Sequence, residues 1–353
     1  MKKIILFLIM ITVFSLLAGE RTIATFSIVA YDPLMDEWGV AVQSKFFAVG
    51  AVVPEAEAGR GAIASQAWGN TMYRQKAMEL FEEGIDAEDA LNQLLESDSN
   101  YQYRQVGLID FEGNPAAFTG EKCSDWAGHR TGKHYAVQGN ILAGPEVIDS
   151  MAAAFENAEG ALAGRLLRAL EAGQNAGGDK RGRQSAALLV VSENGGYSGF
   201  DDRMTDIRID DHARPIEELR RLYDIHKETF LGSAYIRIGI NALNCNNHLK
   251  ADSAIARALN IAEKVSDNAM LYNSIAWEFA INDYRLEDAL VYAKKAIELE
   301  PEDGNIWDTL GEVYARMGDY ENAVESEKRA IEFAPDNTIF REKLREWQEE
   351  LQN

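Results

Sequence analysis

Polar side chains interrupt four apolar stretches of the chain, at positions where a buried strand would ordinarily carry apolar residues. Each group taken alone is typical of a loop or a helix cap. Four such groups at strand ends or in apolar surroundings are better explained by convergence on one pocket. The groups are Gln43, Ser44 and Lys45; Ser65, Gln66, Asn70 and Thr71; Gly139 and Asn140; and Asp179, Lys180, Arg181 and Gln184.

Thr25 lies where an apolar leader meets the first predicted strand, in the stretch LLAGERTIATFSIVAYD. Inside a strand, a threonine is only a good β-former. At a free N-terminus it carries its own general base, because the α-amine has an unperturbed pKa of about 7.7 to 8 and can take the hydroxyl proton. The first residue of the mature chain therefore decides which chemistry Thr25 can perform.

The leader has the pattern of a secretory signal, since Lys2 and Lys3 precede an apolar run that lasts until Glu20. It is too short and wrongly flanked for a lasting membrane anchor. We therefore expect an exported protein, periplasmic or extracellular, with no membrane attachment once residues 1–24 are removed. Three cleavage positions are open: after Ala18, after Gly19, or after Ala24, where TIA offers small residues one and three positions before the cut.

Composition limits the partners. The 353 residues predict two domains, and 35 basic against 57 acidic residues give a net charge of −22. Such a surface repels nucleic acid and anionic lipid, so neither is expected as a partner. The only two cysteines, Cys123 and Cys245, are far apart and build no disulfide framework. The five histidines lie scattered and the common catalytic motifs are absent, so we expect no metal and no cofactor.

Residues 25–230 alternate strand-like and helix-like blocks, which predict an α+β domain built as a four-layer αββα sandwich. Two hairpins are expected, TFSIVAYD with WGVAVQSKF and YRQVGLIDF with PAAFTG, as is a pairing of QSAALLVV with YSGF across Gly195-Gly196. Further strands are expected in RGAIASQAW and HYAVQGNIL. Helices are expected at 72–81, at 87–95 with Asp86 as its cap, at 145–155 and at 162–170.

Residues 233–353 have a different pattern, that of tetratricopeptide (TPR) repeats forming an all-α domain. The clear units cover about 270–303 and 304–337, and a degenerate third unit is expected near 233–267. Small residues recur 34 positions apart where paired helices must pack closely, at Ala289 and Ala323 and again at Ala296 and Ala330. The last segment, REKLREWQEEL, is expected to cap the array. The repeats predict a protein partner or self-association; the alternative is a helical bundle without a binding role.

The first domain resembles a bacterial family of unknown function whose fold places it among the N-terminal-nucleophile (Ntn) hydrolases, together with proteasome subunits and penicillin acylases. The resemblance covers about residues 25–230. It rests on TFSIVAYDP, GVAVQSKFFAVGAVVP, QAWGNTMY, RQVGLID, FTGEKCSDWAGHRTG, VQGNILAGPEV and GGDKRGRQSAALLVV.

The resemblance implies three catalytic roles. Thr25 would be the nucleophile, Lys45 a cation that lowers its pKa, and Asn140 a donor to the oxyanion. Ser27 and Ser44 are alternative nucleophiles. Five polar residues of the four groups are expected to contact substrate: Ser44, Asn70, Asp179, Arg181 and Gln184. For Asp179 and Arg181 the alternative is a salt-bridged loop.

The expected function is hydrolysis of a small amide or peptide-like substrate through an acyl-Thr intermediate, with the repeats making protein contacts. The alternative is a non-catalytic module that retains the fold and binds a ligand or a partner.

Overall fold

The computed structural model describes residues 25–264 and 268–352. The predicted leader lies outside these residues. No helix among the residues described is long and apolar enough to cross a bilayer.

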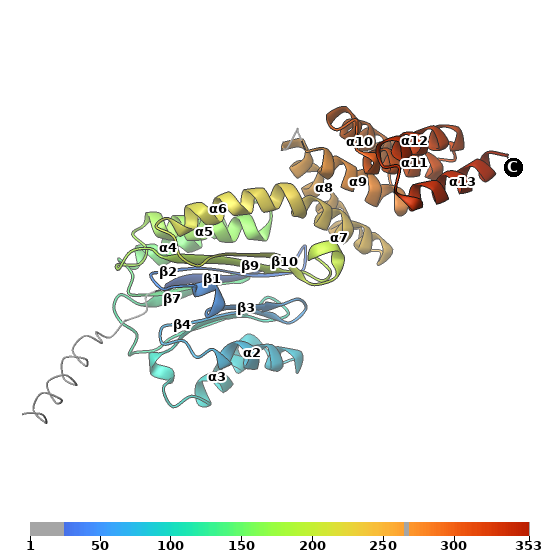
Figure 1. Cartoon of the computed structure of the whole chain (residues 1–353). Coiled ribbons are helices and arrows are strands. Elements are labelled where there is room, and N and C mark those ends of the chain that lie inside the picture. The colour runs from blue at the N-terminus through green and yellow to red at the C-terminus, as the bar shows by residue number, and fades with distance from the viewer. Residues whose placement is uncertain (1–24, 265–267, 353) are drawn as a thin grey trace, which may run out of the picture.

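The first domain contains two antiparallel sheets packed face to face (Figure 1). The six-stranded sheet has the spatial order β10 (Arg203–Ile209), β9 (Ser185–Val191), β2 (Glu37–Ser44), β1 (Thr25–Asp32), β8 (Tyr135–Asn140) and β7 (Gly128–Gly132). The four-stranded sheet has the order β3 (Pro54–Glu57), β4 (Gly61–Gln66), β5 (Gln105–Ile109) and β6 (Pro115–Thr119).

Helices cover the outer face of each sheet, so the predicted four-layer sandwich is confirmed. The six-stranded sheet is covered by α4 (Glu146–Glu156), α5 (Leu162–Asn175) and α6 (Pro215–His226), and the four-stranded sheet by α2 (Met72–Glu82) and α3 (Ala87–Glu96). Short 3₁₀ turns lie at Val49–Ala51, Tyr101–Tyr103 and Tyr197–Gly199. Asp86 caps α3 as predicted, since its carboxylate accepts from the Asp89 amide.

Strand β1 is apolar on both faces because both faces are buried. Phe26 and Ile28 pack against the helix layer. Val29 and Tyr31 point the other way, into the core between the two sheets. This alternation also fixes where the polar residues of β1 point: Thr25 and Ser27 share the face of Val29, toward the interior of the sandwich.

The predicted pairing of QSAALLVV with YSGF is wrong. Strand β9 pairs with β10, whereas Tyr197–Gly199 forms a 3₁₀ turn in the connection between them. Ser198 has a φ of 54°, in the left-handed region, which a continuing strand cannot accommodate. Two short strands, β3 and β7, were also not expected; β7 is mostly exposed and carries no apolar alternation that could have predicted it.

The remaining helices form antiparallel pairs at the predicted repeat positions. They are α7 (Gly232–Asn244) with α8 (His248–Lys264), α9 (Ala269–Ile281) with α10 (Leu286–Leu299), α11 (Gly304–Arg316) with α12 (Tyr320–Phe333), and the closing helix α13 (Thr338–Gln352). The predicted close-packing alanines are fully buried, which confirms their role; these are Ala289, Ala296, Ala323 and Ala330. A TPR-like helical domain therefore follows the sheet-rich domain.

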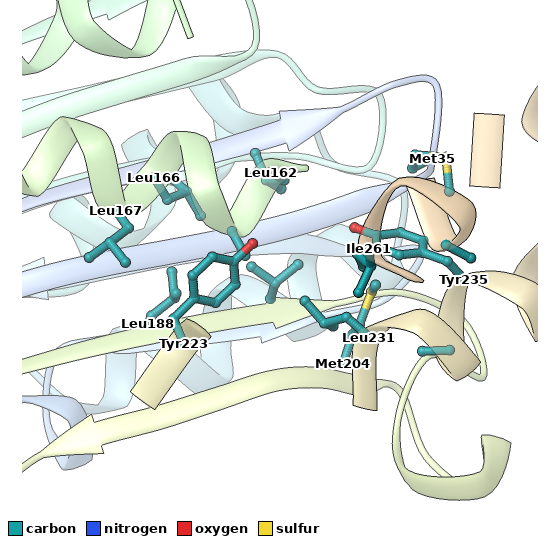
Figure 2. Packing of buried hydrophobic residues seen from close by; sticks show 14 of the residues in the cluster. Met35, Leu162, Leu166, Leu167, Leu188, Met204, Tyr223, Leu231, Tyr235 and Ile261 are labelled. Carbon is teal, nitrogen blue, oxygen red and sulfur yellow. The ribbon is translucent and has the colours of Figure 1, made fainter. Parts of the chain in front are cut away.

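The two domains are joined without a break in helical structure. Helix α6 continues through a π-helical turn, Lys227–Leu231, into α7. Figure 2 shows Met35 of the β1–β2 turn beside Tyr235 of α7 and Ile261 of α8, all within one apolar cluster. The core of the sandwich is thus continuous with the core of the first helix pair.

Ion pairs reinforce this junction at the turn between β1 and β2. The Arg257 guanidinium of α8 donates to Asp32 Oδ2 at 2.8 Å and lies 3.4 Å from Glu37 Oε1. Lys250 Nζ donates to Asp36 Oδ2 at 2.9 Å. Asp32 and Glu37 are buried, so the helical domain supplies the counter-charges that the hairpin needs.

Candidate functional site

A row of polar residues closes one end of the sandwich. The strand register places these residues opposite one another on the inward faces of both sheets. In the larger sheet the row runs Ser185, Ser44, Thr25 and Asn140, and in the smaller sheet Gln66, Gln105 and Thr119. Residues that are far apart in the sequence therefore meet at one strand end.

Thr25 lies in the middle of this row and is the first residue of β1. Its hydroxyl donates to Ser44 Oγ at 3.1 Å, and its Cα partner on the other side is Asn140. Both Thr25 and Ser44 are fully buried. The structure therefore brings together three of the residues that the sequence singled out, two hydroxyls and one carboxamide.

Buried amides link the two sheets beneath Thr25. Gln66 Oε1 accepts from the Ser27 hydroxyl at 2.6 Å, and Gln138 Nε2 donates to the same hydroxyl at 2.7 Å. Gln66 Nε2 in turn donates to Gln105 Oε1 at 2.8 Å and lies 3.3 Å from the Thr25 carbonyl oxygen. Gln138 Oε1 has no hydrogen-bond partner among the residues described, but the other amide atoms of Gln66, Gln105 and Gln138 are paired, and in a low-dielectric interior such bonds hold their members rigidly.

Asn140 is oriented by this network. Its Nδ2 donates to Gln105 Oε1 at 3.0 Å, and Gln105 Nε2 donates to the Gly139 carbonyl at 2.8 Å. The close packing needs Gly107, because a Cβ there would lie 2.1 Å from Gln138 Oε1. The carboxamide is therefore fixed beside Thr25, although its donor points to Gln105.

Gln105 and Gln138 are parts of this network that the sequence did not single out. Each is a lone glutamine in an apolar strand, in YRQVGLID and AVQGNIL, and each is fully buried. A buried glutamine must find hydrogen-bond partners, which was the available signal. The partners lie on other strands, however, so the sequence alone did not connect them.

Lys45 contacts Asp179 through its main-chain N–H and not through its side chain. The Lys45 N–H donates to Asp179 Oδ2 at 2.8 Å. The Lys45 side chain is exposed, and its Nζ donates to the Arg183 carbonyl at 3.2 Å. The geometry thus directs this amine toward the 180–184 loop, and the role proposed for it beside Thr25 stays a prediction.

Asp179 anchors the loop that follows α5. Only 4% of it is exposed, and the Arg181 guanidinium donates to its Oδ2 at 2.9 Å. The Gln184 N–H donates to the Ser44 carbonyl at 3.1 Å, whereas the Gln184 amide donates to Asp211 at 3.0 Å. Asp179 and Gln184 thus hold the two polar groups of the peptide unit between Ser44 and Lys45, so they position the end of β2.

Asn70 lies in a separate polar cluster. Its Nδ2 donates to Asp98 Oδ2 at 3.1 Å, and the Arg104 guanidinium donates to the same oxygen at 2.8 Å. The hydrogen bond from Arg104 holds the pKa of Asp98 well below its usual range. No contact that the structure gives for Asn70 reaches Thr25.

The chemistry available at the polar row is that of neutral groups. Its members are hydroxyls and carboxamides, which can donate to a developing oxyanion or orient a nucleophile. Across the described ranges there is no group of three or more His, Cys, Asp or Glu residues arranged to hold a metal ion.

Comparison with known proteins supports the division into two parts. The model of a family of unknown function, DUF1028, matches residues 25–219. The model of the ChAPs, described as Chs5p-Arf1p-binding proteins, matches residues 217–327. No curated protein matches the chain.

Among solved structures, the chain is similar to protein SPO2555 from Silicibacter pomeroyi, described with the same DUF1028 family. The two are 34% identical with a TM-score of 0.52, and the match covers 57% of this chain and 84% of that one. The first TPR domain of human RPAP3 matches at 15% identity with a TM-score of 0.28, covering 34% of this chain and 92% of that one. The Sgt2 TPR domain from Aspergillus fumigatus matches at 21% identity with a TM-score of 0.28, covering 34% and 79%.

Proposed function

Because residues 25–219 make this chain a member of the DUF1028 family of unknown function, we propose, from its own geometry, that the sheet-rich domain is an amide hydrolase that uses Thr25 as an N-terminal nucleophile. The observation that carries the proposal is the position of Thr25. It is the first residue of the family match, and its hydroxyl lies in a row of buried polar groups at one end of the strands.

Activation would be removal of the residues before Thr25. Thr25 is fully buried in the uncut chain, and its nitrogen is then an amide, which is not a base. Cleavage after Ala24 would release an α-amine beside the hydroxyl. Export and activation would then be one event, because the same cut would remove the leader.

The reaction would follow from the groups in place. The Thr25 hydroxyl oxygen attacks the substrate carbonyl while its α-amine takes the proton, and the amine then passes that proton to the leaving nitrogen. Water hydrolyses the acyl-Thr25 ester and returns the free hydroxyl. Asn140 would donate to the oxyanion after its side chain turns from Gln105, and Ser44 would orient the nucleophile through its hydrogen bond.

The experiment joins a mass measurement to labelling. The intact mass of the protein recovered after export should match a chain that begins at Thr25. A probe that acylates the nucleophile and releases an amine should then label this chain. It should also label Thr25→Ser, and it should not label Thr25→Ala. Thr71→Ala, at an exposed threonine, is the matched control and should label as the parent does.

Three outcomes would overturn the proposal. A mature chain that begins at residue 19 or 20 leaves Thr25 without an amine. Labelling that persists in Thr25→Ala and disappears in Ser27→Ala or Ser44→Ala makes another hydroxyl the nucleophile. A correctly cut chain that no acyl probe labels makes the domain a binding module, the alternative function.

The TPR-like helices supply the second half of the proposed function, contact with a protein. The family whose model matches residues 217–327 is named for binding other proteins, and stacked helix pairs are surfaces suited to that use. We infer that α9 to α13 bring the hydrolase domain to a protein partner. Crosslinking in the compartment to which the protein is exported should capture the partner with the full chain. A chain that lacks residues 304–352 should capture no partner.

A further inference from the structure

A cavity of about 540 Å³ lies where the two domains meet. One wall is the connection between β9 and β10, and the others are β10, the π-helical turn, α7 and α9. Helix α7 contributes Ser233 and Arg237, four residues apart, and α9 contributes Asn273 and Trp277, also four apart. Each helix therefore turns one face toward the same space.

This cavity is separate from the polar row around Thr25. Strand β9 begins at Ser185, opposite Ser44, and ends at Val191, opposite Trp38. The cavity begins just beyond the Val191 end, at Gly195. Six residue steps at about 3.3 Å each place the two sites roughly 20 Å apart along the strand.

Four charged side chains of the described residues line the cavity, and only Arg203 and Asp206 among them form an ion pair with each other, at 2.6 Å. Arg237 donates through Nη2 to the Gly196 carbonyl at 2.9 Å, but its Nε is buried without a hydrogen-bond partner. Glu278 also lines the space, and its attraction to Arg237 opposes part of the effect of burial on the pKa of each. Burial lowers the pKa of Arg237 and raises that of Glu278, as expected for charges deprived of solvent.

A second group also lacks a partner. Asn273 lines the cavity, only 9% of it is exposed, and its Oδ1 accepts no hydrogen bond. Buried polar atoms in folded proteins are nearly always paired with protein, water or a ligand. Arg237 Nε and Asn273 Oδ1 therefore lack a partner in the described part of the chain, which a bound molecule would supply once these side chains turn toward the cavity.

Aromatic side chains complete the walls. Phe230 and Tyr197 meet edge to face with ring centroids 6.1 Å apart, although 47% and 71% of them are exposed. Trp277 lies between Asn273 and Glu278 along α9. An apolar group placed against these rings would remove them from water.

We propose that this cavity binds a small zwitterion with an apolar side group, an amino acid or a dipeptide. Its carboxylate would accept from Arg237, its ammonium would donate to Glu278 and Asn273 Oδ1, and its side group would lie against Phe230 and Tyr197. Because both domains supply walls, occupancy would stabilise their docking. The inference does not depend on the proposed hydrolase activity, which uses the other end of the sheet.

The test is calorimetric titration and thermal unfolding of the full chain with a matched set of probes. L-phenylalanine and L-phenylalanyl-glycine both carry the two charges, and comparing them distinguishes the amino acid from the dipeptide. L-phenylalaninamide lacks the carboxylate and N-acetyl-L-phenylalanine lacks the ammonium. At least one zwitterion should bind and raise Tm, and the analogues that lack one charge should bind at least tenfold more weakly.

Variants assign the binding to the cavity. Arg237→Met and Glu278→Gln should each weaken the zwitterion at least tenfold, whereas Arg237→Lys should retain part of the affinity. Arg316→Met, at an arginine outside the cavity, is the matched control and should bind as the parent does. Circular dichroism of each unliganded variant checks that the variant is folded. If Arg237→Met does not fold, the analogue series measured on the parent still decides the test.

The proposal is overturned if neither zwitterion binds at millimolar concentration. It is also overturned if the amide or the acetylated analogue binds as tightly as L-phenylalanine, or if folded Glu278→Gln retains full affinity. Loss of acyl labelling in Thr25→Ala with zwitterion binding intact would separate the two sites.

Discussion

The two ends of the β1–β2 hairpin are both polar and both buried, yet they are stabilised in different ways. At one end Thr25 and Ser44 belong to a network of hydroxyls and carboxamides within the sandwich. At the other end Asp32 and Glu37 are charged, and their partner Arg257 belongs to the helical domain. The neutral end takes its hydrogen-bond partners from its own domain, whereas the charged end takes its cation from the other domain.

The difference follows from the cost of burial. A neutral amide or hydroxyl is satisfied by one or two hydrogen bonds from neighbouring strands. A buried carboxylate needs a counter-charge as well. The hairpin therefore separates a neutral, hydrogen-bonded end from an electrostatic junction with the helical domain.

The largest expected effect is loss of that junction. Arg257→Met would leave Asp32 and Glu37 buried without their cation, and we expect the free energy of unfolding to fall by about 3 to 5 kcal/mol. Urea unfolding measures it. Arg316→Met, which removes a more exposed arginine paired with Glu312, is the control and should lose less than about 1 kcal/mol. Equal losses in the two variants would mean that the junction is not held by charge.

The neutral end should be less costly to break. Gln66→Leu would leave the Ser27 hydroxyl and Gln105 Oε1 short of a partner, and we expect a loss of about 2 to 3 kcal/mol. Gln75→Leu, on the exposed face of α2, is the matched control and should stay within about 0.5 kcal/mol of the parent. If both variants unfold alike, the buried network contributes nothing to stability.

The two ends should also differ in their response to pH. Burial raises the pKa of Glu37 from 4.5 to about 7. The folded state then binds more protons than the unfolded state between about pH 4.5 and 7, so this group makes stability fall as the pH rises through that window. Glu37→Gln should remove this pH dependence, which changes the free energy of unfolding by about 1 to 3 kcal/mol across the window.

Thermal unfolding at pH 5 and pH 8 measures this slope. The charged and titratable groups that act on Glu37 are Asp32 beside it, Arg257 of α8, Arg165 of α5, Tyr235 of α7 and Tyr223 of α6. Glu325→Gln, at an exposed position of α12, should keep the slope of the parent. A slope unchanged in Glu37→Gln would place the titrating group elsewhere.

The smallest effect is expected at Lys45. Its side chain is exposed and contacts only the Arg183 carbonyl among the hydrogen bonds given for it. Lys45→Met should therefore change the free energy of unfolding by less than about 0.5 kcal/mol. It should also leave acylation of Thr25 within tenfold of the parent. A loss of labelling as complete as in Thr25→Ala would support the catalytic role that the family resemblance implies for Lys45.

Local patterns in the sequence were sufficient for much of the fold. Alternation and turn residues predicted the β1–β2 and β5–β6 hairpins, and the recurrence of small residues predicted the helix pairs, because both signals lie within a few tens of residues. The same signals failed where a short exposed strand, β7, or a strand after a long connection, β10, takes its place through partners that local pattern does not show.

The sequence by itself determined which residues are polar in apolar surroundings, and so where along each strand a site could lie. Only the tertiary structure decided which of them meet. Thr25 joins Ser44 and Asn140 because three strands share a register, whereas Lys45 turns its amine away and Asn70 pairs with Asp98. Arg257 reaches Asp32 across 225 positions. These contacts join residues that are far apart in the sequence. They depend on how sheets and helices pack, which the local spacing of residues does not show.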